Sequence, residues 1–230
     1  MNIELEELRK QLTSGKINIT DTSSVIKKGI INNQQGESFN YEVTHGWNVI
    51  EAMNCDTKWG KFNLELFEFI RDQNYSEEEL TEVLSKLSIE DNHWDWFAKS
   101  MVHRQDEYEW FFLTANGSPQ GACVIYHPKT SVIDEENIFY IEYVAAAPWN
   151  RDNPYKEKSF SGIGSILINC ALDYSVNTLG LVHGFSLHSL PKAKPYYEKI
   201  GMITFSDLDK GTLAYYEMPR KMAKDMVEAI

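Results

Sequence analysis

The chain has 230 residues, of which 43% are hydrophobic and 24% charged, and this is enough apolar material for one globular domain with a sizeable core. Its formal net charge of −12 disfavours a nucleic-acid partner, because binding to the phosphate backbone needs clustered Lys and Arg. No apolar run is long enough to cross a bilayer, and the three cysteines are too widely spaced for a disulfide framework or a metal site, so we expect a cytoplasmic protein without membrane or metal binding.

The first 75 residues give the least regular pattern. The apolar spacing over residues 5–12 predicts a short helix, whereas residues 17–37 are rich in Asn, Gln, Ser and Gly and are expected to connect other elements. Alternation over residues 39–43 predicts a strand, and residues 62–70 fit a helix but also permit a strand. We therefore treat residues 1–75 as an N-terminal extension of undetermined structure, which includes the first strand of the main domain if that domain begins near residue 38.

The pattern becomes regular from residue 76. Ser76 and Glu79 form a capping box that opens a helix with apolar residues at Leu80, Val83, Leu84 and Leu87, and a second helix is expected after Asp91-Asn92. Two strands, 109–115 and 122–127, flank a hairpin turn. The strand predicted over 138–147 is almost continuously apolar, which is typical of a central position in a sheet.

The remaining elements alternate between helix and strand. They are a helix over 164–176, a strand over 185–190, a short helix over 191–200, and two strands over 202–205 and 212–218. The order predicts an α/β fold with a mixed central sheet flanked by helices. We assign residues 76–220 to this domain and residues 221–230 to a C-terminal helical tail.

A glycine-rich turn, Ser161-Gly162-Ile163-Gly164-Ser165, stands directly before the helix over 164–176. Glycines let a ligand approach the backbone closely, and the first N–H groups of a helix point outward with the positive end of its dipole, which suits a pyrophosphate. Arg151, Lys156 and Lys158 in the preceding loop could add charge-assisted contacts. A dinucleotide fingerprint would need a glycine at Leu167, and a phosphate-binding P-loop would need a lysine after Gly164, so neither motif is present. The alternative that the turn only joins a strand to a helix stays open.

Two segments resemble the GNAT N-acetyltransferase superfamily. Ala146-Ala147-Pro148 at the strand end and Gly162-Ile163-Gly164 at the turn resemble its cofactor motif, and the segment 193–202 resembles its Ala-x-x-Phe-Tyr-x-x-x-Gly-Phe motif. The resemblance covers about residues 76–218 and implies the GNAT fold, acetyl-CoA as cofactor, and acetyl transfer to a primary amine of a small molecule or a protein. Ser159 stands where the family has Arg or Gln, and the loop over 151–161 is long.

The turn and the resemblance together imply a set of cofactor contacts. By the resemblance, the backbone of Ala145 and Ala146 at the end of the central strand would bond the pantetheine arm and polarise the thioester carbonyl. The residues are Ala145, Ala146, Ala147, Arg151, Ser159, Ser161, Gly162, Ile163, Gly164, Ser165, Ser189 and Tyr197.

Two residues are candidates for catalysis. Tyr197 matches the family tyrosine that protonates the CoA sulfur, with packing on a short helix as the alternative. Glu142 is a candidate base because a carboxylate inside an apolar strand is costly to bury without a role, and strict alternation places it on one face with Val144 and Ala146. A solvent-facing Glu142 is an equal alternative, and His188 is a second candidate base. The sequence also leaves open a homodimer and a GNAT-like domain that binds CoA without transferring acetyl groups.

Overall fold

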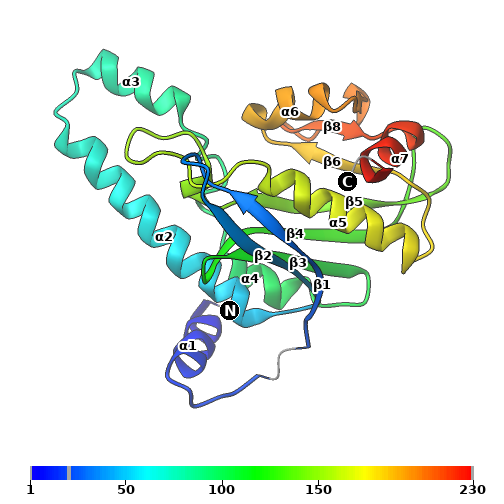
Figure 1. Cartoon of the computed structure of the whole chain (residues 1–230), viewed down its shortest axis with the longest axis horizontal. Helices are drawn as coiled ribbons and strands as arrows, with labels where there is room; N and C mark the ends of the chain where they lie inside the picture. The colour runs from blue at the N-terminus through cyan, green and yellow to red at the C-terminus, as the bar shows by residue number, and fades with distance from the viewer. Residues whose placement is uncertain (1, 20–21, 229–230) are drawn as a thin grey trace.

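A mixed sheet of eight strands organises the chain in the computed structural model, which describes residues 2–19 and 22–228 (Figure 1). The strand order is β1-β2-β3-β4-β5-β6-β8-β7, and every neighbouring pair is antiparallel except β5 and β6, which are parallel. The predicted α/β fold with a mixed sheet is thereby confirmed. The strands are β1 (Ser24–Asn32), β2 (Ser38–His45), β3 (Tyr108–Ala115), β4 (Ser118–Thr130), β5 (Asn137–Ala146), β6 (Phe185–Ser189), β7 (Ile203–Thr204) and β8 (Ala214–Glu217).

Helices cover both faces of the sheet. Helices α5 and α7 pack on one face, whereas α2 and α4 contribute to the cluster of aromatic residues on the other. Within the described ranges no helix is both long and apolar enough to cross a membrane. The helices are α1 (Asn2–Thr13), α2 (Val49–Asp72), α3 (Glu77–Lys86), α4 (Trp96–Val102), α5 (Ile163–Asn177), α6 (Lys194–Lys199) and α7 (Arg220–Glu228), with short turns η1 (Pro148–Asn150), η2 (Pro191–Ala193) and η3 (Ser206–Leu208).

The N-terminal third contributes to the same sheet. Residues 17–37 were expected to be connecting structure, and this was wrong, because they contain β1, which pairs with β2 at the edge of the sheet. An edge strand with only Ile31 buried has little apolar alternation to reveal it. The strand predicted over 39–43 is β2, and the segment 62–70 lies inside α2, whose N-terminus is capped by the side chain of Asn48. The domain boundary at residue 75 stays a prediction.

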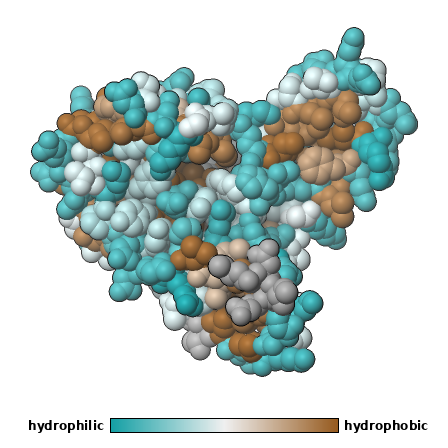
Figure 2. Space-filling model, turned by 180° about the vertical axis from the view of Figure 1, so that it is seen from behind, coloured by the Kyte–Doolittle hydropathy of each residue, from teal (hydrophilic) through white to brown (hydrophobic). Residues whose placement is uncertain are grey.

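Helices α2 and α3 extend from the body of the molecule (Figure 1). The capping box is present, with Ser76 and Glu79 bonding each other's backbone N–H groups, yet α3 buries none of its residues. Its predicted apolar face is exposed at Leu80 and Leu84, and Figure 2 shows an apolar patch on this part of the molecule. The second predicted helix, α4, begins later than expected, because Asp95 caps it.

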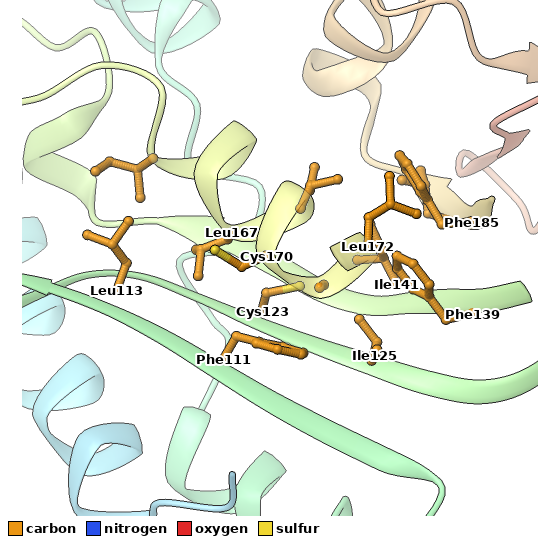
Figure 3. Close-up of a cluster of buried hydrophobic side chains, with 14 of the residues drawn as sticks. Phe111, Leu113, Cys123, Ile125, Phe139, Ile141, Leu167, Cys170, Leu172 and Phe185 are labelled. Carbon is orange, nitrogen blue, oxygen red and sulfur yellow. The ribbon is translucent and has the colours of Figure 1, made fainter. Parts of the chain in front are cut away.

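The main core lies between α5 and strands β3, β4 and β5. Large side chains from all four elements interdigitate here, as Figure 3 shows, and Phe111, Ile125, Phe139 and Leu167 are almost fully buried. The predicted helical tail is α7 over the described residues, and residues 229 and 230 lie outside them. The core therefore fixes α5, and with it the glycine turn, against the middle of the sheet.

Side chains of α5 pack directly against Gly121 on β4. A methyl group at this position would lie 2.6 Å from Ile163 Cγ2 and 2.8 Å from Leu167 Cδ1. We expect Gly121→Ala to lower the free energy of unfolding by about 1–3 kcal/mol, because overpacking forces the helix away from the sheet. Chemical denaturation measures this change. Gly60→Ala in α2 is the control, since a methyl group there meets no atom within 4 Å, and equal losses in both variants would contradict the prediction.

Candidate active site

A cleft opens where the two parallel strands separate. Strands β5 and β6 pair only from Phe139 opposite Phe185 to Ile141 opposite Leu187, although β5 continues to Ala146 and β6 to Ser189. The cleft between their ends has a volume of about 650 Å³. Glu142, Ser189 and Tyr197, which were predicted from separate parts of the sequence, all line it.

A β-bulge in β5 sets the direction of the side chains at this cleft. Tyr143 lies opposite Val124 and Ile141 lies opposite Ile125, so Glu142 is the extra residue with no partner in β4. Ile141, before the bulge, and Val144, after it, both pack on the face of the sheet that α5 covers. Tyr143 packs in the aromatic cluster on the other face.

The bulge corrects the predicted orientation of Glu142. Strict alternation placed Glu142 on one face with Val144 and Ala146, and this was wrong. The charge of Lys99 on α4 acts on the Glu142 carboxyl, and the Lys99 ammonium lies 3.5 Å from the ring centroid of Tyr143, so Glu142 faces the α4 side. A single extra residue is enough to reverse the phase of a strand.

Val144 lines the cleft, and Ala146 lines a smaller hollow that adjoins it at Val144. Ala145 lies opposite Ala122, and the N–H of Ala147 donates to Gln120 O (2.8 Å), so the polar groups of Ala145 and the N–H of Ala147 are used by β4, while Ala147 O accepts from the N–H of Asn150 (2.9 Å). By alternation the N–H and C=O groups of Val144 and Ala146 point the other way, where β6 has already separated. The backbone groups of Ala145 therefore point to β4 and not to the cleft, unlike what the predicted contact with the pantetheine arm requires, and this follows from the pairing of β5 with β4.

The sequence predicts that Arg151 contacts a cofactor phosphate, but in the structure its guanidinium already has other partners. Its guanidinium forms an ion pair with both carboxylate oxygens of Asp91 and donates to Ala146 O (2.9 Å from Nε) and to Ser88 O (2.9 Å). Across the cleft, the ammonium of Lys192 on η2 donates to Leu87 O, and its backbone N–H donates to Glu90 (3.1 Å). The segment 87–91 thus bridges the end of β5 and η2.

The glycine turn precedes α5 as predicted. Gly162 is the N-cap residue, with a positive φ of 81° that favours glycine, and no side chain caps the helix. A methyl group on Gly164 would meet no atom within 4 Å, so space stays open beside the first turn. The outward N–H groups of Ile163, Gly164 and Ser165 have no acceptor inside the helix. This arrangement fits the pyrophosphate that the sequence resemblance implies.

Helix α6 connects the glycine turn to the cleft. The hydroxyl groups of Ser165, in the first turn of α5, and Tyr196 lie 2.9 Å apart and share a hydrogen bond. The adjacent Tyr197 is 6% exposed and lines the cleft. Burial raises the pKa of Tyr197 well above its usual value, so its phenol keeps its proton. Among the described residues no group hydrogen-bonds the Tyr197 hydroxyl, whereas Ser189 Oγ donates to Leu190 O (2.8 Å).

Glu142 and His188 differ in their freedom to accept a proton. Burial raises the pKa of the Glu142 carboxyl, while the charges of Lys210 and Lys99 act in the opposite direction. His188 Nε2 donates to the carbonyl of Leu208 (2.8 Å), which can only accept, so Nδ1 of the neutral ring accepts from the Tyr140 hydroxyl (2.7 Å). Burial lowers the pKa of His188, which keeps the ring neutral. Both nitrogens are occupied, and His188 positions Tyr140.

The loop before the turn lines a hollow other than the cleft. Ser159, Lys156 and Lys158 line a separate hollow beside α2, and Lys158 pairs with Asp152 (2.9 Å). Ser161 is exposed at the turn itself. In the described ranges no group of three or more His, Cys, Asp or Glu side chains is arranged to hold a metal ion.

The fold is similar to several solved acetyltransferase structures. A nucleotide-linked sugar GNAT, FdhC in its apo form, has a TM-score of 0.49 and 13% identity over 88% of this chain and 93% of its own. The GNAT domain of S. lividans PAT has a TM-score of 0.48 and 9% identity, over 83% of this chain and 96% of its own. A GCN5-related N-acetyltransferase from Ralstonia eutropha JMP134 has a TM-score of 0.41 and 16% identity, over 74% of this chain and 97% of its own.

No family model and no curated protein matches the chain. These structural likenesses say nothing of the chemistry, which depends on the residues of the cleft. The expectation that the chain binds no nucleic acid stays a prediction.

Proposed function

We propose that the chain is an N-acetyltransferase that moves an acetyl group from acetyl-CoA to a primary amine in the cleft between β5 and β6. The observation that carries the proposal is that Glu142 and Tyr197 line one cleft together with Val144, whose backbone polar groups face away from β4. The hydrogen bond between Ser165 and Tyr196 ties the glycine turn to this cleft. If the pyrophosphate of acetyl-CoA binds at the glycine turn, its thioester would lie in the cleft between Val144 and Tyr197. This placement accounts for both the turn and the cleft.

The chemistry follows from the charge state of each residue. Acetyl-CoA, when bound, supplies an acetyl group activated as a thioester. Glu142, kept protonatable by burial, takes the proton that the amine must lose as its nitrogen bonds to the carbonyl carbon. An N–H on the Val144–Ala146 edge stabilises the charge on the carbonyl oxygen. As the C–S bond breaks, Tyr197 gives its proton to the sulfur, and solvent returns the two residues to their starting states, leaving an amide and CoA.

Incubation with acetyl-CoA and a panel of amines tests the proposal directly. We expect amine-dependent release of the free CoA thiol, together with acetylated amine detected by mass spectrometry. CoA should also raise the melting temperature, because a ligand that binds only the folded state stabilises it. CoA binding without any thiol release across the panel would contradict the transfer step and leave only cofactor binding.

The glycine turn allows a separate test of the cofactor site. We expect Gly164→Val to weaken CoA binding about tenfold, corresponding to about 1.4 kcal/mol, because its side chain would stand where phosphate oxygens approach the helix N–H groups. Isothermal titration calorimetry measures the change. Gly60→Val in α2 is the matched control, since both positions are helical with open space around them. Gly162 is less suitable because its positive φ would strain any substitute, and equal CoA affinity in both valine variants would argue against the turn.

A domain that binds CoA without transfer is the second candidate. The bridge over 87–91 favours it, because Arg151 occupies Ala146 O and Lys192 holds the bridge from the other side. If this function holds, thiol release is absent in the wild type. Arg151→Met would then free Ala146 O and loosen the segment 87–91, yet mass spectrometry would still detect no acetylated amine.

A further inference from the structure

A second hollow continues the cleft along β5, past the bulge. Its volume is about 390 Å³, and we name it the tyrosine pocket. Four residues line both the cleft and this pocket, so the two spaces meet, and the shared residues are Tyr140, Glu142, His188 and Lys210. Glu142 therefore lies at the junction, with Tyr197 on the cleft side and the tyrosine pocket on the other.

Aromatic rings form most of the wall of the tyrosine pocket. Tyr108 and Tyr126 have ring centroids 5.3 Å apart, and the ring of His188 lies 5.2 Å from that of Tyr215. The hydrogen bond to His188 fixes Tyr140, so this side of the wall is ordered before any ligand enters. The lining residues are Tyr108, Tyr126, Lys129, Tyr140, Glu142, His188, Leu208, Lys210 and Tyr215. Such walls favour a planar or apolar body of small-molecule size.

The charged groups of the tyrosine pocket oppose the overall charge of the chain. Two lysines, Lys129 and Lys210, line it with a single carboxylate, Glu142, although the whole chain carries −12. In the part of the chain that the structure describes, neither lysine has a carboxylate within ion-pair distance. The nearby carboxylate of Asp209 accepts from the backbone N–H of Tyr215 (2.8 Å). The two ammonium groups are therefore available to an anion on a ligand.

We propose that the tyrosine pocket is the acceptor site and that the acceptor is a small primary amine with a planar or apolar body and an anionic group. The amine lies at Glu142, the body contacts the tyrosine rings, and a carboxylate or phosphate pairs with Lys129 and Lys210. This inference rests on the proposed function and adds the substrate class. It further predicts that polyamines bind weakly although the protein is strongly acidic, because the local charge of the pocket rather than the net charge meets the ligand.

Calorimetry on the CoA-loaded protein tests the ligand class without requiring turnover. The probes are para-carboxyphenethylamine, tyramine phosphate, the uncharged-ring control para-methylphenethylamine, and spermidine. We expect the better of the two anionic amines to bind at least about tenfold more tightly than para-methylphenethylamine, since a charge-assisted hydrogen bond is lost in the control. Comparing the affinities of the carboxylate probe and the phosphate probe shows which anion the pocket prefers. Equal affinity of anionic and neutral probes, or tighter binding of spermidine, would overturn the proposal.

Lysine variants connect this preference to the tyrosine pocket. Lys129→Met and Lys210→Met should each reduce the preference for the anionic amine, and the double variant should bring it close to parity. Lys224→Met on α7 is the control, because that lysine is exposed and lies outside the pocket. An unchanged preference in the double variant would refute the site. Thiol release separates the two proposals: lysine-dependent binding without release supports the pocket and rejects transfer, whereas release that is independent of the lysines supports transfer and rejects the pocket.

Discussion

Replacing Tyr197 by phenylalanine is expected to lower kcat at least about a hundredfold, while the dissociation constant for CoA changes less than about twofold. The hydroxyl is the only group removed, and among the described residues it has no hydrogen-bond partner, so the fold should lose little stability. Burial raises the pKa of Tyr197, which keeps the proton on the phenol until a thiolate forms nearby. Steady-state kinetics together with calorimetry for CoA separate turnover from binding.

Tyr196→Phe is the matched control for this experiment. It removes a hydroxyl from the neighbouring residue on the same short helix, where the lost contact is the hydrogen bond to Ser165. We expect this variant to affect CoA binding more than turnover, because it loosens the contact with the first turn of α5. If Tyr197→Phe turns over as fast as the wild type, Tyr197 is a packing residue, as the ring contacts with Tyr196 (5.2 Å) and Tyr216 (5.9 Å) would then indicate.

Much of the fold could be predicted because its central strands are buried on both faces and form nearly continuous apolar runs, whereas α5 buries one face. The strands β3 to β6 and helix α5 carry apolar patterns that specify their type, and the glycine turn and Tyr197 were placed by local motifs. Strand β1 could not be found in this way, because it lies at the sheet edge and buries only Ile31. Its pairing with β2 is a tertiary property that residues 17–37 do not encode by periodicity.

The candidate site shows the same limit on a smaller scale. The bulge at Glu142 depends on how β5 pairs with β4, so the sequence of β5 alone predicts the wrong face for Glu142 and the wrong backbone partner at Ala145. Arg151 was assigned to the cofactor by its type and place in the loop, but Asp91, from a distant segment, binds its guanidinium. Lys99 and Lys210 next to Glu142 had no local signal at all.

Glu142→Gln is expected to lower kcat/KM about a hundredfold or more near neutral pH, because the amine loses its proton acceptor. The wild type should lose activity as the pH falls through the pKa of Glu142, which burial raises above its usual value, since only the ionised carboxylate can take a proton. The variant should lack this acidic limb. A pH profile of kcat/KM for both proteins measures the loss near neutral pH and the acidic limb.

Glu107→Gln is the matched control for the pH profile. The carboxylate of Glu107 is exposed and acts on the same Tyr108 that Glu142 influences, but it lines neither the cleft nor the tyrosine pocket. It should therefore leave the acidic limb in place. If Glu142→Gln keeps that limb as well, another group sets it, and His188 is the poorer candidate because both of its ring nitrogens are already hydrogen-bonded. A water chain to solvent would then have to take the proton, and the bulge at Glu142 would serve only to separate β5 from β6.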